Sequence, residues 1–283
     1  MMWSIFRLVP KNAVSFFVGL VTRIPSCWAA RVFGKLVGID MAEAELPLVS
    51  SGSIEALFTR RLRAGARPCV APMCSPADGK LTSPLAPVLD GRLLSAKGSF
   101  YTPAELFFGR HADGESVLAA PVRSTFTIYL APHNYHRVHS PVAGRLICVR
   151  HLPGELWPVN PPSVRNVPRL FARNERVTFE IEADFGGKIY LAMVGAMNVG
   201  RIEVAHMEKV IANTFFRQIS CRPRSFSLSE RLNLGDELGT FMLGSTVVVG
   251  LDAVAADGLS FLQLACDAHV VVGQQMAKRN SNT

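Results

Sequence analysis

The hydrophobic pattern of the chain predicts a protein built mainly from β-strands. Five runs rich in β-branched and aromatic residues are bounded by glycine, proline or asparagine, as strands commonly are. These runs are 124–130, 144–150, 176–182, 188–196 and 245–251. Helices of crossover length do not alternate with them, so a parallel doubly wound sheet is not expected. The pattern therefore predicts an α+β fold whose sheet is mainly antiparallel.

Helical patterns occupy the N-terminus and a few short segments. Residues 1–40 are predicted to be helical, and 53–65 is predicted to be a short amphipathic helix that Gly65 ends, with arginines placed to favour the helix dipole. Residues 102–109 carry the signature of a capping box, with proline at the first helical position. The proline-rich stretch 158–168 is predicted to be a loop, and its length favours a functional one.

The N-terminal pattern is typical of helices that lie in a lipid interface. The apolar run 13–21 is about half as long as a membrane-spanning helix must be. Basic and aromatic residues interleave throughout 1–40, as Arg23 does with Phe17 and Trp28. We expect amphipathic helices that rest on a membrane surface. The alternative is a pair of helices packed on the protein's own core.

Composition narrows the classes of partner. Hydrophobic residues form 49% of the 283 residues and charged residues 18%, which excludes a disordered chain, and the net charge is +8. A basic surface suits nucleic acid, anionic lipid or an anionic substrate. The chain has no lysine-rich run or arginine–aromatic array, so we expect a membrane surface and no nucleic acid. The six cysteines include no C-x-x-C pair, which favours reduced thiols in a cytosolic compartment.

Three histidines crowd one short segment. His133, His136 and His139 lie within APHNYHRVHSP, residues 131–141. In a strand, a spacing of three places side chains on opposite faces. The helical zinc motif, which has histidines four apart and a glutamate between them, is absent. A metal site, a catalytic role and ordinary surface histidines all remain open from this segment alone.

A nucleophile set is a second candidate for chemistry. Ser245 follows a glycine at the start of a buried strand, and Asp78 lies in an Asp-Gly turn. With a histidine, these residues could supply a nucleophile, a base and an orienting group. The G-x-S-x-G turn of α/β-hydrolases is missing, because this serine is followed by a strand. A lipase of that class is therefore not expected.

Six segments along nearly the whole chain carry the motifs of one family in order. They are SPADGKL (75–81), AKGSFYTPAELF (96–107), YLAPHNYHRVHSPVAG (129–144), PGELWPVNPPSVRNVPRLFARNERV (153–177), VGAMNVGRIE (194–203) and LGSTVVV (243–249). Together they resemble the phosphatidylserine decarboxylase proenzymes, the pyruvoyl-dependent enzymes of phospholipid synthesis found in bacteria and mitochondria.

The resemblance implies a proenzyme that cuts itself between Gly244 and Ser245. The products would be a β chain, 1–244, and an α chain, 245–283, held together as a heterodimer that could assemble further into a homo-oligomer. Ser245 would become a covalent pyruvoyl group, a pyruvate cofactor made from the chain itself. That group would form a Schiff base with phosphatidylserine and yield phosphatidylethanolamine and carbon dioxide.

The family's residue roles carry over to three further side chains. Asp78 and His139 would complete a triad-like set that activates the Ser245 hydroxyl, and His136 would act mainly in decarboxylation. Many bacterial relatives have an acid at the position of Asn134, so the support that this residue gives to His136 is open. The candidates for binding the head-group phosphate are Arg165, Arg169 and Arg173.

The resemblance also implies an organisation and a place in the cell. We expect membrane-associating helices over 1–40 and a catalytic domain over 41–283, peripheral to the cytoplasmic side of the cell membrane. SPVAGRLICV and VGAMNVG also resemble the barrel-sandwich core of biotinyl and lipoyl carrier domains.

Two alternatives remain beside the decarboxylase. One is a zinc-dependent peptidase that uses the histidine cluster 133–139. The other is a non-enzymatic membrane-bound carrier or scaffold, which would need a modifiable lysine where VGAMNVG has Asn198.

Overall fold

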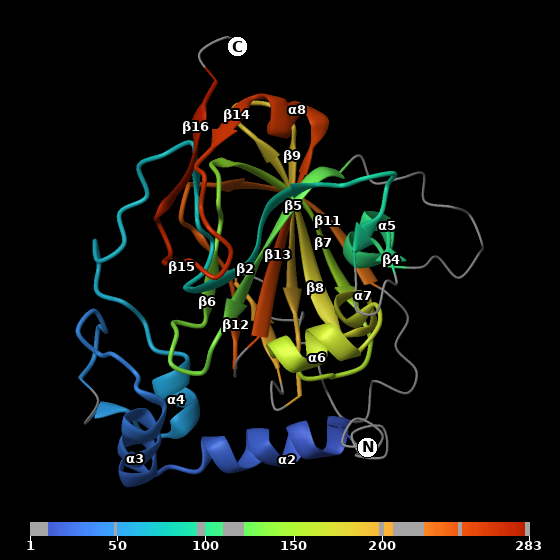
Figure 1. Ribbon diagram of the computed structural model, residues 1–283. Coiled ribbons are helices and arrows are strands. Elements are labelled where there is room, and N and C mark those ends of the chain that lie inside the picture. Colours follow the sequence, from blue (N-terminus) through green and yellow to red (C-terminus); the bar gives the residue numbers. More distant parts are fainter. Residues whose placement is uncertain are drawn as a thin grey trace.

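The structure is a computed structural model, and it describes residues 11–47, 50–94, 100–109, 122–197, 201–205, 224–242 and 245–280. Its largest element is an eight-stranded antiparallel sheet in the order β11-β7-β8-β9-β13-β5-β2-β15 (Figure 1). The strands are β2 (Gly79–Pro87), β5 (Val122–Leu130), β7 (Gly144–Leu152), β8 (Arg176–Ala183), β9 (Lys188–Val194), β11 (Arg224–Leu232), β13 (Ser245–Asp252) and β15 (His269–Val270). The predicted α+β class with a mainly antiparallel sheet is confirmed.

Smaller sheets complete the β-structure. One contains β1 (Met73–Cys74), β16 (Gln275–Arg279) and β14 (Leu259–Phe261); another contains β10 (Ile202–Val204), β12 (Glu237–Phe241) and β6 (Arg137–His139); and β3 (Leu93–Leu94) pairs with β4 (Phe100–Tyr101). The expected barrel-sandwich core is not confirmed. Within the described residues the large sheet does not close, because β11 and β15 form its two edges.

The five predicted strands correspond to β5, β7, β8, β9 and β13. Every residue of β13 is buried, and the strand pairs with β5 on one side and β9 on the other. This central position explains why the run 247–251 is apolar throughout instead of alternating. Gly250 lets the ring of Phe107 pack against the strand, since a Cβ there would lie 2.9 Å from the ring.

The helices are short and lie around the sheet. They are α2 (Lys11–Arg23), α3 (Cys27–Val37), α4 (Ile54–Phe58), α5 (Pro103–Phe107), α6 (Pro161–Asn166), α7 (Leu170–Arg173) and α8 (Ala253–Asp257). The predicted capping box is confirmed in α5. There the Thr102 hydroxyl accepts from the Glu105 amide, and the Glu105 carboxylate accepts from the Thr102 amide, each at 3.0 Å.

Two of the local predictions were wrong. The helix expected over 53–65 is only the five-residue α4, and the Arg137 guanidinium binds the carbonyl of its C-cap residue, Thr59, at 2.9 and 3.1 Å. The arginines that follow therefore lie beyond the helix and do not complement its dipole. The stretch 158–168, predicted to be a loop, contains α6. Asn160 caps that helix, and its prolines occupy first-turn positions where no amide donor is needed.

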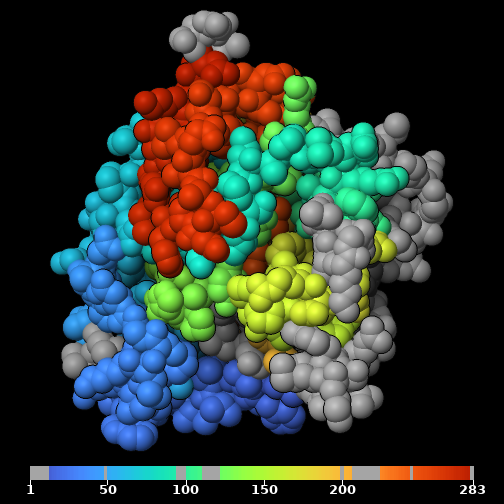
Figure 2. All heavy atoms as spheres, in the orientation of Figure 1, coloured from blue at the N-terminus to red at the C-terminus, as the bar shows by residue number. Residues whose placement is uncertain are grey.

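The N-terminal helices gather at one end of the molecule. Figure 1 places α2, α3 and α4 at this end, whereas α8, β14 and β16 lie at the opposite end. In the space-filling view, α2 and α3 form the lower margin of the molecule (Figure 2). No single described helix is long and apolar enough to cross a membrane, although α2 from Ala13 and α3, bent by 118°, meet the length and composition test as a pair. The five described cysteines are free, and Cys27 and Cys266 are exposed.

Candidate active site

Ser245 occupies the first position of β13, opposite Leu130 at the end of β5. The residue is completely buried, and its Oγ has no hydrogen-bond partner among the described residues. Gly244, its predicted partner in cleavage, lies outside the described residues. A buried hydroxyl without a partner costs about 1–3 kcal/mol, so this serine is a candidate for a chemical role.

The topology brings the histidine segment toward this serine. From Leu130, which is paired with Ser245, β5 continues into the loop that carries His136 and then into β6. β6 pairs with β12, whose last residue, Phe241, precedes Ser245 by four positions. The amide of Phe241 donates to the carbonyl of His136 at 3.0 Å. The end of β5, the start of β6, the end of β12 and Ser245 are together called the junction.

Asp78 reaches the same junction from the other side of β5. Gly79 lies directly against the main chain of β5, where a Cβ would be 2.4 Å from the Tyr129 carbonyl oxygen, so only glycine fits. The amide of His139 donates to the Pro76 carbonyl at 2.9 Å. The Asp-Gly turn is therefore held beside His139, as the triad prediction requires.

His136 is poised as a neutral base. Its ring is completely buried, and Nδ1 donates to the Asn134 carbonyl at 2.8 Å, which leaves the lone pair on Nε2. That nitrogen is buried and has no partner in the described part of the chain. Burial lowers the pKa of His136 to about 3, so the ring is neutral at pH 7. The ring of Phe58 in α4 covers it, with ring centroids 4.0 Å apart.

Asn134 supports His136 through its main chain. Its side-chain Oδ1 accepts from the amide of Ala131 at 2.8 Å and closes the turn. The group that orients His136 is the carbonyl of the same residue. The absence of an acid at this position therefore leaves the hydrogen bond to the histidine intact.

His139 is oriented by a carbonyl as well. Its Nδ1 donates to the Gly235 carbonyl at 2.8 Å, and Nε2 accepts from the Tyr135 hydroxyl at 3.1 Å. Burial lowers the pKa of His139, while the nearby charges of Glu237 and Asp78 act to raise it.

Asp78 acts on this histidine through its charge instead of a hydrogen bond. Its Oδ1 accepts from the Val272 amide at 2.7 Å and its Oδ2 from Arg67 at 3.1 Å. Burial raises the pKa of Asp78, whereas the Val272 amide and the Arg67 charge lower it. Asp78 therefore lies within electrostatic reach of His139, but the group that holds the His139 ring is the Gly235 carbonyl and not Asp78.

The remaining candidates have other surroundings. His133 is exposed. Arg169 pairs with Glu105, Arg173 pairs with Glu155 at 2.8 Å, and Arg165 is exposed. Among the described residues, no three histidine, cysteine or acidic side chains are placed to hold a metal ion.

Sequence reasoning missed two residues of this site, Phe58 and Arg60. Both lie in the segment 53–65, for which the sequence predicts an amphipathic helix, and both contact the histidine loop. The apolar and basic residues of that segment do not indicate which part of the protein it packs against.

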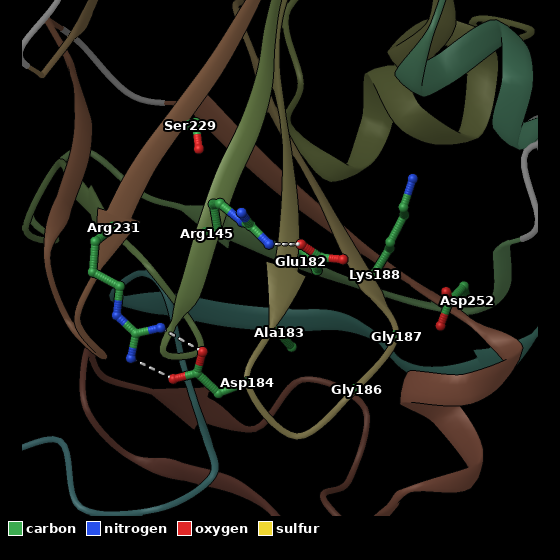
Figure 3. A pocket seen from close by; sticks show the side chains of 10 residues that line it. All are labelled: Arg145, Glu182, Ala183, Asp184, Gly186, Gly187, Lys188, Ser229, Arg231 and Asp252. Carbon is green, nitrogen blue, oxygen red and sulfur yellow. Dashed lines mark hydrogen bonds and ion pairs between the residues drawn. The ribbon is translucent and has the colours of Figure 1, made fainter.

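An open cleft of about 610 Å³ lies far from this site (Figure 3). Asp252, the last residue of β13, lines it, and seven residue steps of strand separate that position from Ser245, a span of about 23 Å. Most of its charges are matched by neighbours: Arg145 with Glu182, Arg231 with Asp184, and Lys188 with Glu180. Of the charged residues that line the cleft, Asp252 has no ion pair among the described residues, and its Oδ1 accepts from the Ala255 amide at 2.8 Å as the cap of α8.

Comparison with known proteins decides which family this site belongs to. Residues 54–278 match the family model described as phosphatidylserine decarboxylase. The chain belongs to the phosphatidylserine decarboxylase family. The match covers the Phe58 segment, both histidines and Ser245, so the site lies wholly inside the shared region. The predicted family is confirmed, and with it the prediction that the chain is an enzyme, a decarboxylase of the lyase class.

Similar proteins extend over most of the decarboxylase chain. A phosphatidylserine decarboxylase proenzyme of Anaeromyxobacter sp. (strain K) is 40% identical over 257 residues, 87% of each chain. Another, from Brevibacillus brevis, is 36% identical over 255 residues, 88% of each chain. A third, from Bordetella petrii, is 40% identical over 254 residues, covering 85% of this chain and 84% of the relative.

Proposed function

We propose that the chain is a proenzyme that cuts itself at Gly244–Ser245 and then converts phosphatidylserine into phosphatidylethanolamine and carbon dioxide. The observation that carries this proposal is the buried, unpartnered Oγ of Ser245 at the junction that holds His136 and His139. Relatives that cover most of the chain are named proenzymes of this decarboxylase.

In the cleavage step, His139 takes the proton of the Ser245 hydroxyl. Its Nδ1 keeps the hydrogen bond to the Gly235 carbonyl, which fixes the tautomer. The Tyr135 hydroxyl must first break its hydrogen bond to Nε2, and Nε2 then accepts the proton of Ser245. The negative charge of Asp78 favours the imidazolium that results. The serine oxygen then attacks the Gly244 carbonyl, which exchanges the amide for an ester. Loss of the Ser245 α-proton then expels the Gly244 carboxylate as the new end of the β chain and leaves dehydroalanine at position 245. Water hydrolyses the imine form of that residue, which gives the pyruvoyl group and ammonia.

The fold supports a stable two-chain product. The α chain, 245–283, would begin with β13, which is paired on both sides within the large sheet. β15 of that chain pairs with β2, and β16 pairs with β1. The cut ends would therefore stay in place, because four strand pairings, made by three strands of the α chain, join it to the β chain, 1–244.

The pyruvoyl group fits at position 245, since a buried hydroxyl without a partner is replaced there by a carbonyl. When formed, it would hold the substrate amine covalently and accept the electrons released as carbon dioxide leaves. His136 is suited to move the protons. Because burial lowers the pKa of His136, its protonated Nε2 would be a strong donor to the carbon that has lost the carboxylate.

The N-terminal helices would deliver this site to lipid. Trp28 and Leu36 of α3 are 72% and 79% exposed, which is unusual for large apolar side chains, and Phe17 of α2 is also exposed. Arg31 and Lys35 accompany them on α3. Residues 1–40 would thus bind an anionic membrane from the cytoplasmic side as a peripheral anchor, with 41–283 as the catalytic domain.

The proposal is tested by intact mass and carbon dioxide release from phosphatidylserine. The wild-type protein should separate into 1–244 and a 245–283 piece without a free amino terminus. His139→Ala and Ser245→Ala should remain one uncut chain. His136→Ala should be cut yet lose carbon dioxide release by about 100-fold or more.

His133→Ala is the matched control, because this exposed histidine belongs to the same loop. It should cut and decarboxylate like the wild type. A single uncut wild-type chain in an active preparation, or a cut elsewhere, would refute the cleavage. If His136→Ala and His139→Ala behaved alike, the division of roles would be wrong.

A further inference from the structure

Arg60 keeps two buried donors without a partner beside the site. Its Nη2 donates to the His133 carbonyl at 3.1 Å. Its Nε and Nη1 are buried, and neither has a hydrogen-bond partner in the described residues. A guanidinium is ionised at every physiological pH, so buried donors that lack an acceptor are costly. An anion that enters the site would satisfy both donors.

The backbone around Arg60 is clamped over the histidine loop. The guanidinium of Arg137 binds the Thr59 carbonyl and, through its other nitrogen, both carboxylate oxygens of Glu237 at 2.7 and 2.9 Å. One residue before Thr59, Phe58 covers the His136 ring. The charge of Arg60 acts on Asp78 and on His136. Arg60 is therefore held within the electrostatic reach of the catalytic groups.

The neighbouring arginines are already matched by carboxylates. Arg67 binds Glu43 and Asp78. Arg137 binds Glu237. The charge of Arg60, by contrast, is matched by no ion pair in the described part of the molecule. Of these three arginines, it alone could accept an anion without first losing a partner.

We infer that Arg60 binds the phosphodiester of the lipid head group. The inference rests on the proposed function, because it names the group that positions the substrate of that reaction. The substrate offers two anions, a carboxylate and a phosphodiester. The carboxylate loses its charge as carbon dioxide leaves, so a cation on it would stabilise the ground state more than the transition state. The phosphodiester keeps its charge throughout the reaction.

The position of Arg60 also matches the order of groups along the lipid. Phe33 of the exposed helix α3 packs on Phe58 at 6.3 Å between ring centroids, and Phe58 packs on His136 at 4.0 Å. The α4 segment thus connects the helices proposed to touch lipid with the catalytic histidine (Figure 1). In the substrate, the phosphodiester likewise lies between the glycerol, at the membrane, and the serine amine, at the catalytic centre.

Kinetics of the cleaved enzyme test this assignment in uncharged detergent micelles containing phosphatidylserine. Arg60→Gln should raise KM about tenfold to a hundredfold and change kcat by less than about threefold, because the interaction is the same in the ground and transition states. The KM of Arg60→Lys should fall between those of the wild type and Arg60→Gln. Arg61→Gln, which removes an exposed charge from the adjacent residue, is the matched control and should resemble the wild type.

Binding to an uncut chain separates this inference from the proposed function. The probe is glycerophosphoethanolamine, a soluble phosphodiester without carboxylate or acyl chains, titrated by calorimetry into Ser245→Ala and Ser245→Ala/Arg60→Gln. At least a tenfold loss of affinity in the double variant is expected, and inorganic phosphate should bind the single variant more weakly than the probe. Equal affinities, binding to neither variant, or a fall in kcat with KM unchanged would overturn the role of Arg60. An inactive, uncut wild type would instead refute the proposed function and leave the binding result to stand alone.

Discussion

At the scale of single residues, main-chain carbonyls orient both histidines that we propose to be catalytic. The carbonyls of Asn134 and Gly235 each accept from a ring Nδ1 at 2.8 Å, so both rings present Nε2 as the basic nitrogen. The two nitrogens differ in what they meet. That of His139 accepts from the Tyr135 hydroxyl, whereas that of His136 is buried without a partner. Two neutral bases with different surroundings suit two successive proton transfers.

The buried His136 makes stability depend on pH. Its pKa is about 3 in the folded chain and about 6.5 when unfolded, so below pH 6.5 the unfolded state takes up a proton that the folded state refuses. The free energy of unfolding should therefore fall between pH 6.5 and 5 by about 2 kcal/mol from this residue alone. Urea unfolding of Ser245→Ala with and without His136→Gln isolates the effect as a difference in slope. Parallel pH profiles would contradict it.

Asn134 allows a direct test of main-chain support. Asn134→Asp should leave kcat within about threefold of the wild type, because the carbonyl that holds His136 is unchanged. Asn134→Ala removes the acceptor for the Ala131 amide and should lower the free energy of unfolding by about 1 kcal/mol. Steady-state kinetics and urea unfolding measure the two effects. A tenfold gain in kcat with aspartate would mean that the side chain does support the histidine.

The candidate site residues could be named from sequence, but their contacts could not. The family resemblance named Asp78, His136, His139 and Ser245 as candidates, and their catalytic roles stay predictions. That Gly235 and not Asp78 holds the His139 ring depends on β12 lying beside β6, which is a long-range pairing. No local pattern encodes such a pairing.

At the scale of elements, α4 is a cover for the histidine loop. A five-residue helix has little stability of its own, so its place depends on packing and on the Arg137 clamp. The sequence predicts a longer helix, over 53–65, because the basic residues that follow Phe58 are also typical of the last turn of a helix. The long apolar strands, by contrast, were predicted correctly. In β13, burial on both faces of the sheet requires a continuous run of apolar residues, and such a run can be recognised in the sequence.

Phe58 should be needed for both stability and decarboxylation. Phe58→Ala should lower the free energy of unfolding by about 3–5 kcal/mol, because the side chain is almost wholly buried. Phe58→Leu keeps most of the volume but loses the ring over His136, and should reduce kcat at least about tenfold as water reaches the base. Phe107→Leu is the control, a buried ring that packs on Tyr190 instead. Equal kcat in the two leucine variants would show that the cover has no catalytic role.

At the scale of the whole molecule, the proposed catalytic site and the proposed lipid contact share one end. The α2–α4 segment lies at that end (Figure 1), and its Phe33 and Phe58 lead to His136 through tilted ring contacts. The opposite end carries α8 and the cleft that Asp252 lines. With both at one end, a lipid could reach the site from the bilayer without a change in the orientation of the enzyme on the membrane surface.

This arrangement predicts which exposed side chains matter for membrane binding. Trp28→Ser with Leu36→Ser removes two large apolar groups from α3 and should weaken binding to phosphatidylserine-containing liposomes about tenfold or more, while the self-cleavage of the chain is unchanged. The matched control is Val70→Ser with Val254→Ser, which removes side chains that are 90% and 61% exposed outside the N-terminal helices. Liposome sedimentation measures binding, and added salt should weaken the wild type because Arg31 and Lys35 contribute charge. Equal loss in both double variants would show that general surface hydrophobicity, and not this end of the molecule, holds the enzyme on lipid.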